Sequence, residues 1–256
     1  MIITADIGNS NITVGGFENG DLNFVFRIST VTGRTSNEYA SLLVNSVLLN
    51  FKRSITVDGA CISSVVPPLT SVFSDAIKLA FDCKEVICLA PGVKTGVTIH
   101  CDDPSSVGAD IISACAAVSN IYSKHAIIVD FGTVTKITLM KKDSVFSGVS
   151  FMPGITIGLK AMSSETAQLP YVGLENALSP LGKNTIDSIK AGAIFGNASM
   201  VDGMIDRICE TEGEDYPLYA TGGLAGFIVP HCKHNLVNDE NLILKGLLFI
   251  YQKNHR

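Results

Sequence analysis

The stretch "ITADIGNSNITVGG", from Ile3 to Gly16, consists of two short apolar runs on either side of a polar turn. Runs of β-branched residues that are bounded by glycine and small polar residues are typical of strands that enter a hairpin. The turn carries an aspartate, a glycine and small polar residues, namely Asp6, Gly8, Asn9, Ser10 and Asn11. We therefore predict an N-terminal β-hairpin with an unusually polar turn.

The same pattern returns in the second half of the chain as "AIIVDFGTVTKIT", from Ala126 to Thr138. In both stretches an apolar run leads into Asp-x-Gly, and small polar residues and a second apolar run follow. The aspartates are Asp6 and Asp130. Two copies of one pattern predict two related halves.

Helical and strand-like segments alternate along the rest of the chain. Helices are predicted from about Thr35, from about Ser106, and from about Thr185 to Phe195 or beyond. A strand over 60–66 is stopped by Pro67 and Pro68. Alternation of this kind favours layered α/β architecture. The boundary between the halves is expected near residues 105–125, and we divide the chain into domains 1–115 and 116–256.

Composition limits the classes of partner and compartment. The 256 residues include 17% charged residues and carry a net charge of −5, which argues against nucleic acid and anionic membranes as main partners. The longest apolar runs are shorter than the roughly 18 residues that span a bilayer, and no charged-then-apolar leader opens the chain. The seven cysteines form no CxxC pair, which fits reduced thiols. We expect a cytoplasmic protein.

The two turns have the chemistry of a phosphate site. A glycine turn after a strand exposes backbone N–H groups, which bind phosphate oxygens. An aspartate there would repel a bare phosphate, but suits one that is bridged by a hydrated Mg²⁺. One Asp-x-Gly alone is a common hairpin signal, whereas two copies, together with Thr221, Gly222 and Gly223 after a later strand, favour the phosphate interpretation. The chain has neither a P-loop nor GxGxxG.

These motifs resemble the acetate kinase, sugar kinase, Hsp70 and actin superfamily, whose two ribonuclease H-like domains close over ATP in the cleft between them. Within it, the order and spacing of several stretches resemble the type III pantothenate kinases. These stretches are "DIGNSN" (6–11), "RTSNEY" (34–39), "SSVVPPL" (63–69), "DDPSSVGAD" (102–110), "DFGTVT" (130–135), "MPGI" (152–155), "LGKNT" (181–185), "ATGGLA" (220–225) and "LKGLLFIYQKN" (244–254).

The resemblance implies ATP-dependent phosphorylation of pantothenate to 4′-phosphopantothenate, the first step of coenzyme A biosynthesis. It implies that Mg²⁺ accompanies ATP near Asp6, and that Asp130 helps to bind a monovalent cation, K⁺ or NH₄⁺. The ATP phosphates would meet the first turn and its flanks, and the glycine turns of the second half: Asp6, Ile7, Gly8, Asn9, Ser10, Asn11, Ile12, Thr13, Gly132, Thr133, Gly222 and Gly223.

Asp110, in "GAD", matches the general base of the family. The resemblance further implies that pantothenate is bordered by Cys101, Gly108, Ala109, Asp110 and Ile111. Thr185 would reach the substrate from the partner subunit of a homodimer. From local sequence alone, an ordinary explanation for Asp110 stays open, because aspartate is favoured in the first turn of a helix.

The chain departs from the family pattern at several positions. Ile111 stands where the family has arginine directly after the base, so a fixed cation is lost there. Lys136 ends "DFGTVTK" (130–136), where the family motif "DFGTATT" ends in threonine. The lysine either supplies a positive charge near the phosphates or lies on a solvent face. The substrate end also differs, with Cys101 for an aromatic residue, Asp103 in "DDP", and changes at Ser147, Ser150 and Phe151.

Two other functions are left open by these departures. One is a nucleotide-binding homologue with weak catalysis that regulates other proteins. The other is a kinase of the same superfamily that acts on a different small alcohol. Release of ADP that depends on the acceptor would distinguish them from a pantothenate kinase.

Overall fold

The computed structural model describes residues 1–51, 55–177 and 179–255. It divides into two compact units, Met1–Tyr122 with the segment from Leu242 onward, and Ser123–Asn241. These units differ from the expected ranges 1–115 and 116–256 at both ends of the second range. A boundary after residue 115 would cut a continuous helix, α3 (Ala109–Ile121), and the last helix belongs to the first unit.

The first unit is built on a sheet with the strand order β3-β2-β1-β4-β5. The central strand β1 pairs antiparallel with β2 and parallel with β4. β2 pairs antiparallel with β3, and β4 pairs parallel with β5. The strands are β1 (Ile2–Ile7), β2 (Asn11–Glu18), β3 (Asp21–Ser29), β4 (Gly59–Ser64) and β5 (Val86–Cys88).

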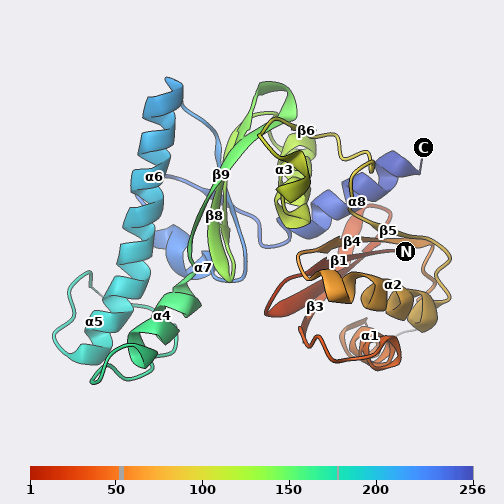
Figure 1. The fold of residues 1–256 in the computed structure, drawn as a ribbon, viewed down its shortest axis with the longest axis horizontal. Coiled ribbons are helices and arrows are strands. Elements are labelled where there is room, and N and C mark those ends of the chain that lie inside the picture. Colours follow the sequence, from red (N-terminus) through yellow and green to blue (C-terminus); the bar gives the residue numbers. More distant parts are fainter. Residues whose placement is uncertain (52–54, 178, 256) are drawn as a thin grey trace. The chain divides into compact units, whose positions relative to one another are not determined.

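Helices cover both faces of this sheet (Figure 1). α1 (Ser36–Phe51) and α2 (Pro67–Phe81) cover one face, where Ile3, Ala5 and Ile7 of β1 enter a core with their side chains. α1 begins with a reciprocal cap, in which Thr35 N donates to Glu38 Oε2 at 2.8 Å. α3 and α8 (Leu242–Asn254) cover the opposite face.

The contact between α3 and α8 explains why the end of the chain joins the first unit. A methyl group at Gly246 of α8 would overlap the carbonyl oxygen of Ser113 on α3, so the two helices approach as closely as their backbones allow. Leu247 and Ile250 of α8 then enter one apolar cluster with Ala116 of α3 and Cys61 of β4. Apolar contacts between residues more than 100 positions apart therefore close this unit. Between β5 and α3 lie β6 (Thr98–Ile99) and the 3₁₀ turn η1 (Pro104–Ser106).

The second unit repeats the arrangement. Its strands follow the order β9-β8-β7-β10-β11, with β7 antiparallel to β8 and parallel to β10. The strands are β7 (Ala126–Phe131), β8 (Val134–Lys141), β9 (Val145–Pro153), β10 (Leu218–Thr221) and β11 (Val237–Asn238). Order and direction match those of the first sheet strand for strand. The predicted α/β class with two related halves is confirmed.

Helices of the second unit bury one face of this sheet. Val129 of β7, Ile137 of β8 and Ala220 of β10 share a core with residues of α4 to α7, and α6 and α7 lie beside β8 and β9 in Figure 1. The helices are α4 (Ile155–Ser164), α5 (Thr185–Ala191), α6 (Asn197–Glu212) and α7 (Ala225–Ile228). The helix predicted from about Thr185 to Phe195 or beyond is present and contains a π-helical turn, η3 (Gly192–Gly196), which joins α5 to α6. Short 3₁₀ turns, η2 (Lys142–Ser144) and η4 (Val229–His231), follow β8 and α7.

None of the helices in the described part of the chain combines the length and the apolar composition that a membrane span requires.

Candidate active site

The first site feature is the β1–β2 hairpin. Its turn is closed by a hydrogen bond from Gly8 N to Asn11 O at 3.0 Å. Asp6 lies directly opposite Thr13 on β2 and beside Ser63 on β4, so the three side chains share one face of the sheet. This is the face that α3 and α8 cover, because Ile2 and Cys61, which share it, pack against those helices.

Buried hydroxyls surround Asp6 on this face. Ser63 and Thr4 are fully buried, and among the described residues neither Ser63 Oγ nor Thr4 Oγ1 has a hydrogen-bond partner. A buried polar group without a partner is costly unless something binds it. The strand ends beside Asp6 therefore offer hard oxygen ligands, the type that Mg²⁺ prefers.

Asp110 belongs to the same unit, in the first turn of α3. It is 7% exposed, and its Oδ1 accepts a hydrogen bond from the backbone N of Ile111 at 2.8 Å. A Cβ at Gly108 would lie 2.5 Å from that Oδ1, so the absence of a side chain at Gly108 leaves room for the carboxylate. The side chain of Ile111 is also buried.

The second hairpin differs from the first at one decisive position. Asp130 lies opposite Lys136 on β8 and beside Thr221 on β10, as Asp6 lies opposite Thr13 and beside Ser63. Lys136 Nζ donates to Asp130 Oδ2 at 2.6 Å, and the side chains of the pair are only 14% and 13% exposed. Of the two interpretations of Lys136, the structure supports a charge at the strand ends and excludes a solvent face.

Gly222 approaches the other oxygen of the Asp130 carboxylate. Its backbone adopts φ +94°, and a Cβ there would lie 2.6 Å from Asp130 Oδ1 and 2.6 Å from the carbonyl of Phe131. The backbone N of Leu224 also donates to Phe131 O at 3.3 Å. The glycine turn after β10 is thus held against the end of β7.

The remaining predicted site residues fall into three groups. Ile7 and Ile12 are buried in the first core, so their side chains cannot meet a ligand and only their backbone groups could. Asn9, Ser10, Asn11, Thr133 and Gly223 are exposed at the turns, and Gly132 is half-buried. Cys101 is half-buried, and the exposed Thr185 begins α5, where Asn184 caps the helix by accepting from Asp187 N at 2.9 Å.

Ser63, which the sequence did not single out, and Thr221, which it named only as part of the glycine turn, complete these sites. Ser63 and Thr221 occupy the same position in the two units, each next to a turn aspartate on a parallel strand. The available signal was the small polar residue that ends each apolar run, in "ACISS" and in "LYAT". Their meaning depends on strand pairing, which the linear sequence does not display.

Departures at the substrate end have local structural roles. The exposed Asp103 accepts from Ser105 N at 3.0 Å and from Ser105 Oγ at 2.6 Å, and these bonds lower the pKa of its carboxyl group. Asp103 therefore caps η1. Among the described residues, no cluster of three or more His, Cys, Asp or Glu side chains could hold a metal ion.

A hollow of about 320 Å³ lies elsewhere in the second unit, between β8, β9 and α6. Ile137, Leu139, Met204 and Ile208 give it an apolar lining. Ser150, one of the departures at the predicted substrate end, also lines it, but none of the predicted catalytic, phosphate-binding or pantothenate-binding residues does.

Comparison with known proteins identifies the family of the chain. The family model described as type III pantothenate kinase matches residues 2–207. A type III pantothenate kinase of Dictyoglomus turgidum is 39% identical over 256 residues, which cover 99% of this chain and 100% of that relative. A type III pantothenate kinase of Geotalea daltonii is 38% identical and covers 99% of each chain.

Solved structures share the fold at low identity. A ROK family glucokinase from Streptomyces griseus, in complex with glucose and AMPPNP, covers 99% of both chains with a TM-score of 0.50 and 12% identity. At this identity the likeness indicates the fold alone, which consists of two ribonuclease H-like domains of the sugar kinase and actin type. The near full-length sequence matches go further: the chain belongs to the type III pantothenate kinase family.

Proposed function

We propose that this chain transfers the γ-phosphoryl group of ATP to the terminal hydroxyl of pantothenate, giving ADP and 4′-phosphopantothenate, the entry step to coenzyme A. The observation that carries the proposal is the repeated placement of an aspartate at a strand end beside a glycine turn, in a chain of this family. In phosphoryl transfer the protein mainly positions the reactants and stabilises the charge of the transition state. Paired turns and strand-end carboxylates supply both.

The phosphates are proposed to meet backbone N–H groups of the turns at 8–11 and 132–133, and of Gly222 and Gly223. The family uses ATP together with a divalent cation, and the hydroxyls of Thr13 and Ser63 beside the Asp6 carboxylate fit Mg²⁺. When bound, Mg²⁺ neutralises charge on the phosphate oxygens. Asp6, at the end of β1, would hold the metal there.

Asp110 is proposed as the general base. Its carboxylate is oriented by the hydrogen bond from Ile111 N. It also occupies space that a side chain at position 108 would fill. A carboxylate held in this way accepts the proton of the substrate hydroxyl as the new P–O bond forms. Gly108, Ala109, Ile111 and Cys101 are proposed to border pantothenate.

A monovalent cation at Asp130 does not fit the residues present. The Asp130 carboxylate has Lys136 Nζ 2.6 Å from Oδ2 and the Gly222 backbone close to Oδ1. We assign no step to K⁺ or NH₄⁺ in this protein.

The active form is proposed to be a homodimer in which Thr185 reaches the partner's substrate. The start of α5 supports this, because Leu181 is 81% exposed and Ile186 49% exposed on either side of Thr185. Apolar side chains gathered around one polar residue are typical of an interface. A second copy of the chain is the occupant that this proposal requires.

The test is ADP release from ATP and Mg²⁺, with and without pantothenate. Asp110→Asn should lower turnover by about 10²- to 10⁴-fold while ATP binding stays unchanged. Asp75→Asn is the matched control, because Asp75 is exposed on α2, where its carboxylate lies 3.4 Å from the ammonium of the exposed Lys78. Release that does not respond to pantothenate would indicate another alcohol. ATP binding without release would indicate a regulatory homologue.

A further inference from the structure

The two hairpins are equivalent in the strand pairing around their aspartates. The partner of Asp6 across the hairpin is Thr13, and the partner of Asp130 is Lys136. On the other side, Ser63 and Thr221 are equivalent hydroxyl residues. The second site therefore carries one more positive charge than the first, at a defined position.

The pair is well shielded from water. Asp130 and Lys136 are 13% and 14% exposed and 2.6 Å apart. In the ion pairs Lys141–Glu212, Lys142–Glu214 and Lys190–Glu175 of the same unit, by contrast, at least one side chain is more than 40% exposed. A carboxylate in such a place requires a compensating cation. A lysine ammonium is a compact unit charge with three donors, so it can fill the position of a bound monovalent cation.

We infer that Lys136 is a built-in monovalent cation, which makes the protein independent of K⁺ and NH₄⁺. The ammonium neutralises Asp130 at the end of β7, and so it fixes the carboxylate beside the Gly222 turn without an ion from solution. Where the inference concerns turnover, it rests on the proposed kinase activity. Where it concerns cation binding, it stands on the geometry of the ion pair.

The internal repeat supplies the decisive substitution. Lys136→Thr gives the second hairpin the same cross-strand pair as the first, an aspartate opposite a threonine. The tethered charge is then lost, and a site of carboxylate and hydroxyl oxygens remains between Asp130 and Thr221. Such a site should take K⁺ or NH₄⁺ from solution.

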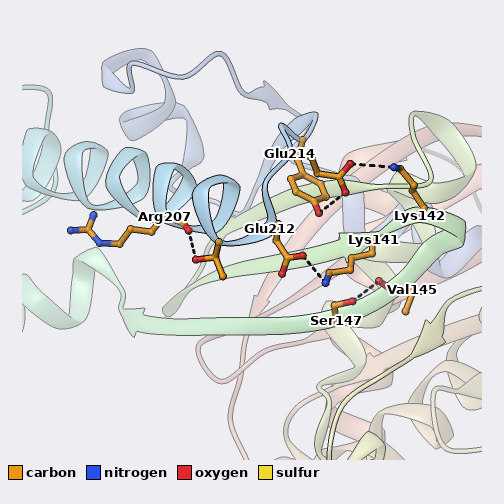
Figure 2. Close-up of polar contacts among 9 residues, drawn as sticks. Lys141, Lys142, Val145, Ser147, Arg207, Glu212 and Glu214 are labelled. Atoms are coloured by element: carbon orange, nitrogen blue, oxygen red, sulfur yellow. Dashed lines mark hydrogen bonds and ion pairs between the residues drawn. The ribbon is translucent and has the colours of Figure 1, made fainter.

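Lys141→Thr is the matched control. Lys141 ends the same strand, and its Nζ lies 2.6 Å from Glu212 Oε2 (Figure 2). The pair is more exposed, with side chains 43% and 24% accessible. The control therefore removes a lysine and an ion pair of equal length from β8 without touching Asp130. Asp130→Asn combined with Lys136→Thr removes the cation site as well.

The experiment measures the thermal midpoint and the rate of pantothenate-dependent ADP release at equal ionic strength in choline, sodium, potassium and ammonium chloride. For the wild type, and likewise for Lys141→Thr, the midpoint should be the same in all four salts and the rate should vary by no more than about twofold among them. Lys136→Thr should lose at least about tenfold of its rate in choline, as expected when one charge is removed from an active site. Potassium or ammonium should restore the rate and raise the midpoint by several degrees, and neither should act on the double variant.

Activation of the wild type by K⁺ or NH₄⁺ would overturn the inference. A thermal midpoint of Lys136→Thr that is the same in all four salts would also overturn it. If no variant releases ADP in any salt, the kinase proposal fails. The midpoints then still decide whether Lys136 occupies a cation site, so the two failures are distinguishable.

Discussion

Replacing Gly222 by alanine tests how tightly the glycine turn is held against the end of β7. The residue has φ +94°, and an added Cβ would lie 2.6 Å from Asp130 Oδ1 and from the Phe131 carbonyl. Positive φ costs an ordinary residue roughly 1–2 kcal/mol. Overlap with backbone that cannot move away adds about 1–3 kcal/mol, so the free energy of unfolding should fall by about 2–5 kcal/mol.

Gly213→Ala separates the two contributions. Gly213 ends α6 in the same unit with φ +72°, and nothing lies within 4 Å of the position of its Cβ. This control should cost only the conformational part, about 1–2 kcal/mol. The excess loss in Gly222→Ala is then the contact with Asp130 and Phe131.

Hydrogen exchange read by mass spectrometry suits the measurement, because the chain has two compact units and a single unfolding transition cannot be assumed. Protection of amides in β7 gives the free energy of opening for the second unit alone. Equal loss of protection in Gly222→Ala and Gly213→Ala would refute the proposed close contact. Loss confined to the turn after β10 would do the same.

Three other perturbations have defined outcomes. Ile186→Asp should shift sedimentation from dimer to monomer, because Ile186 is 49% exposed beside Thr185; an unchanged dimer would place the interface elsewhere. Burial raises the pKa of the Cys115 thiol to about 12, and since only the thiolate reacts, iodoacetamide at pH 8 should modify Cys115 in urea but not in the native protein. Burial, and then the bond to Glu214, raise the pKa of Tyr216 from 10.0 to about 12. Above pH 10 the unfolded chain releases a proton that the folded chain keeps, so the free energy of unfolding should fall between pH 10 and 12, and the fall should be smaller in Tyr216→Phe.

The hairpins and the class of fold were predictable, because the signals are local. Asp6 and Asp130 each end an apolar run before a glycine turn, and both lie where that pattern predicts. Strand 60–66 was also close to the observed Gly59–Ser64, because Pro67 begins the next helix.

The role of Lys136 was not predictable in the same way. Alternation along a hairpin assigns a face only when the register is known, and the register depends on a turn of two residues between β7 and β8. A three-residue turn, as between β1 and β2, would have placed a different residue opposite Asp130. The sequence also did not predict that α8 belongs to the first unit. That arrangement depends on the close approach of Gly246 to Ser113, and these two residues lie far apart in the chain.

The close fit of α8 on α3 has a consequence for synthesis on the ribosome. Residues 123–241 can complete their own unit as soon as they emerge, whereas the first unit has to wait for α8 although most of it was made earlier. Until then, the apolar side chains of Cys61 and Ala116 that α8 covers face water. Exposed apolar surface of this kind binds chaperones and promotes aggregation. Nascent chains halted before Leu242 should therefore be the species that a chaperone retains.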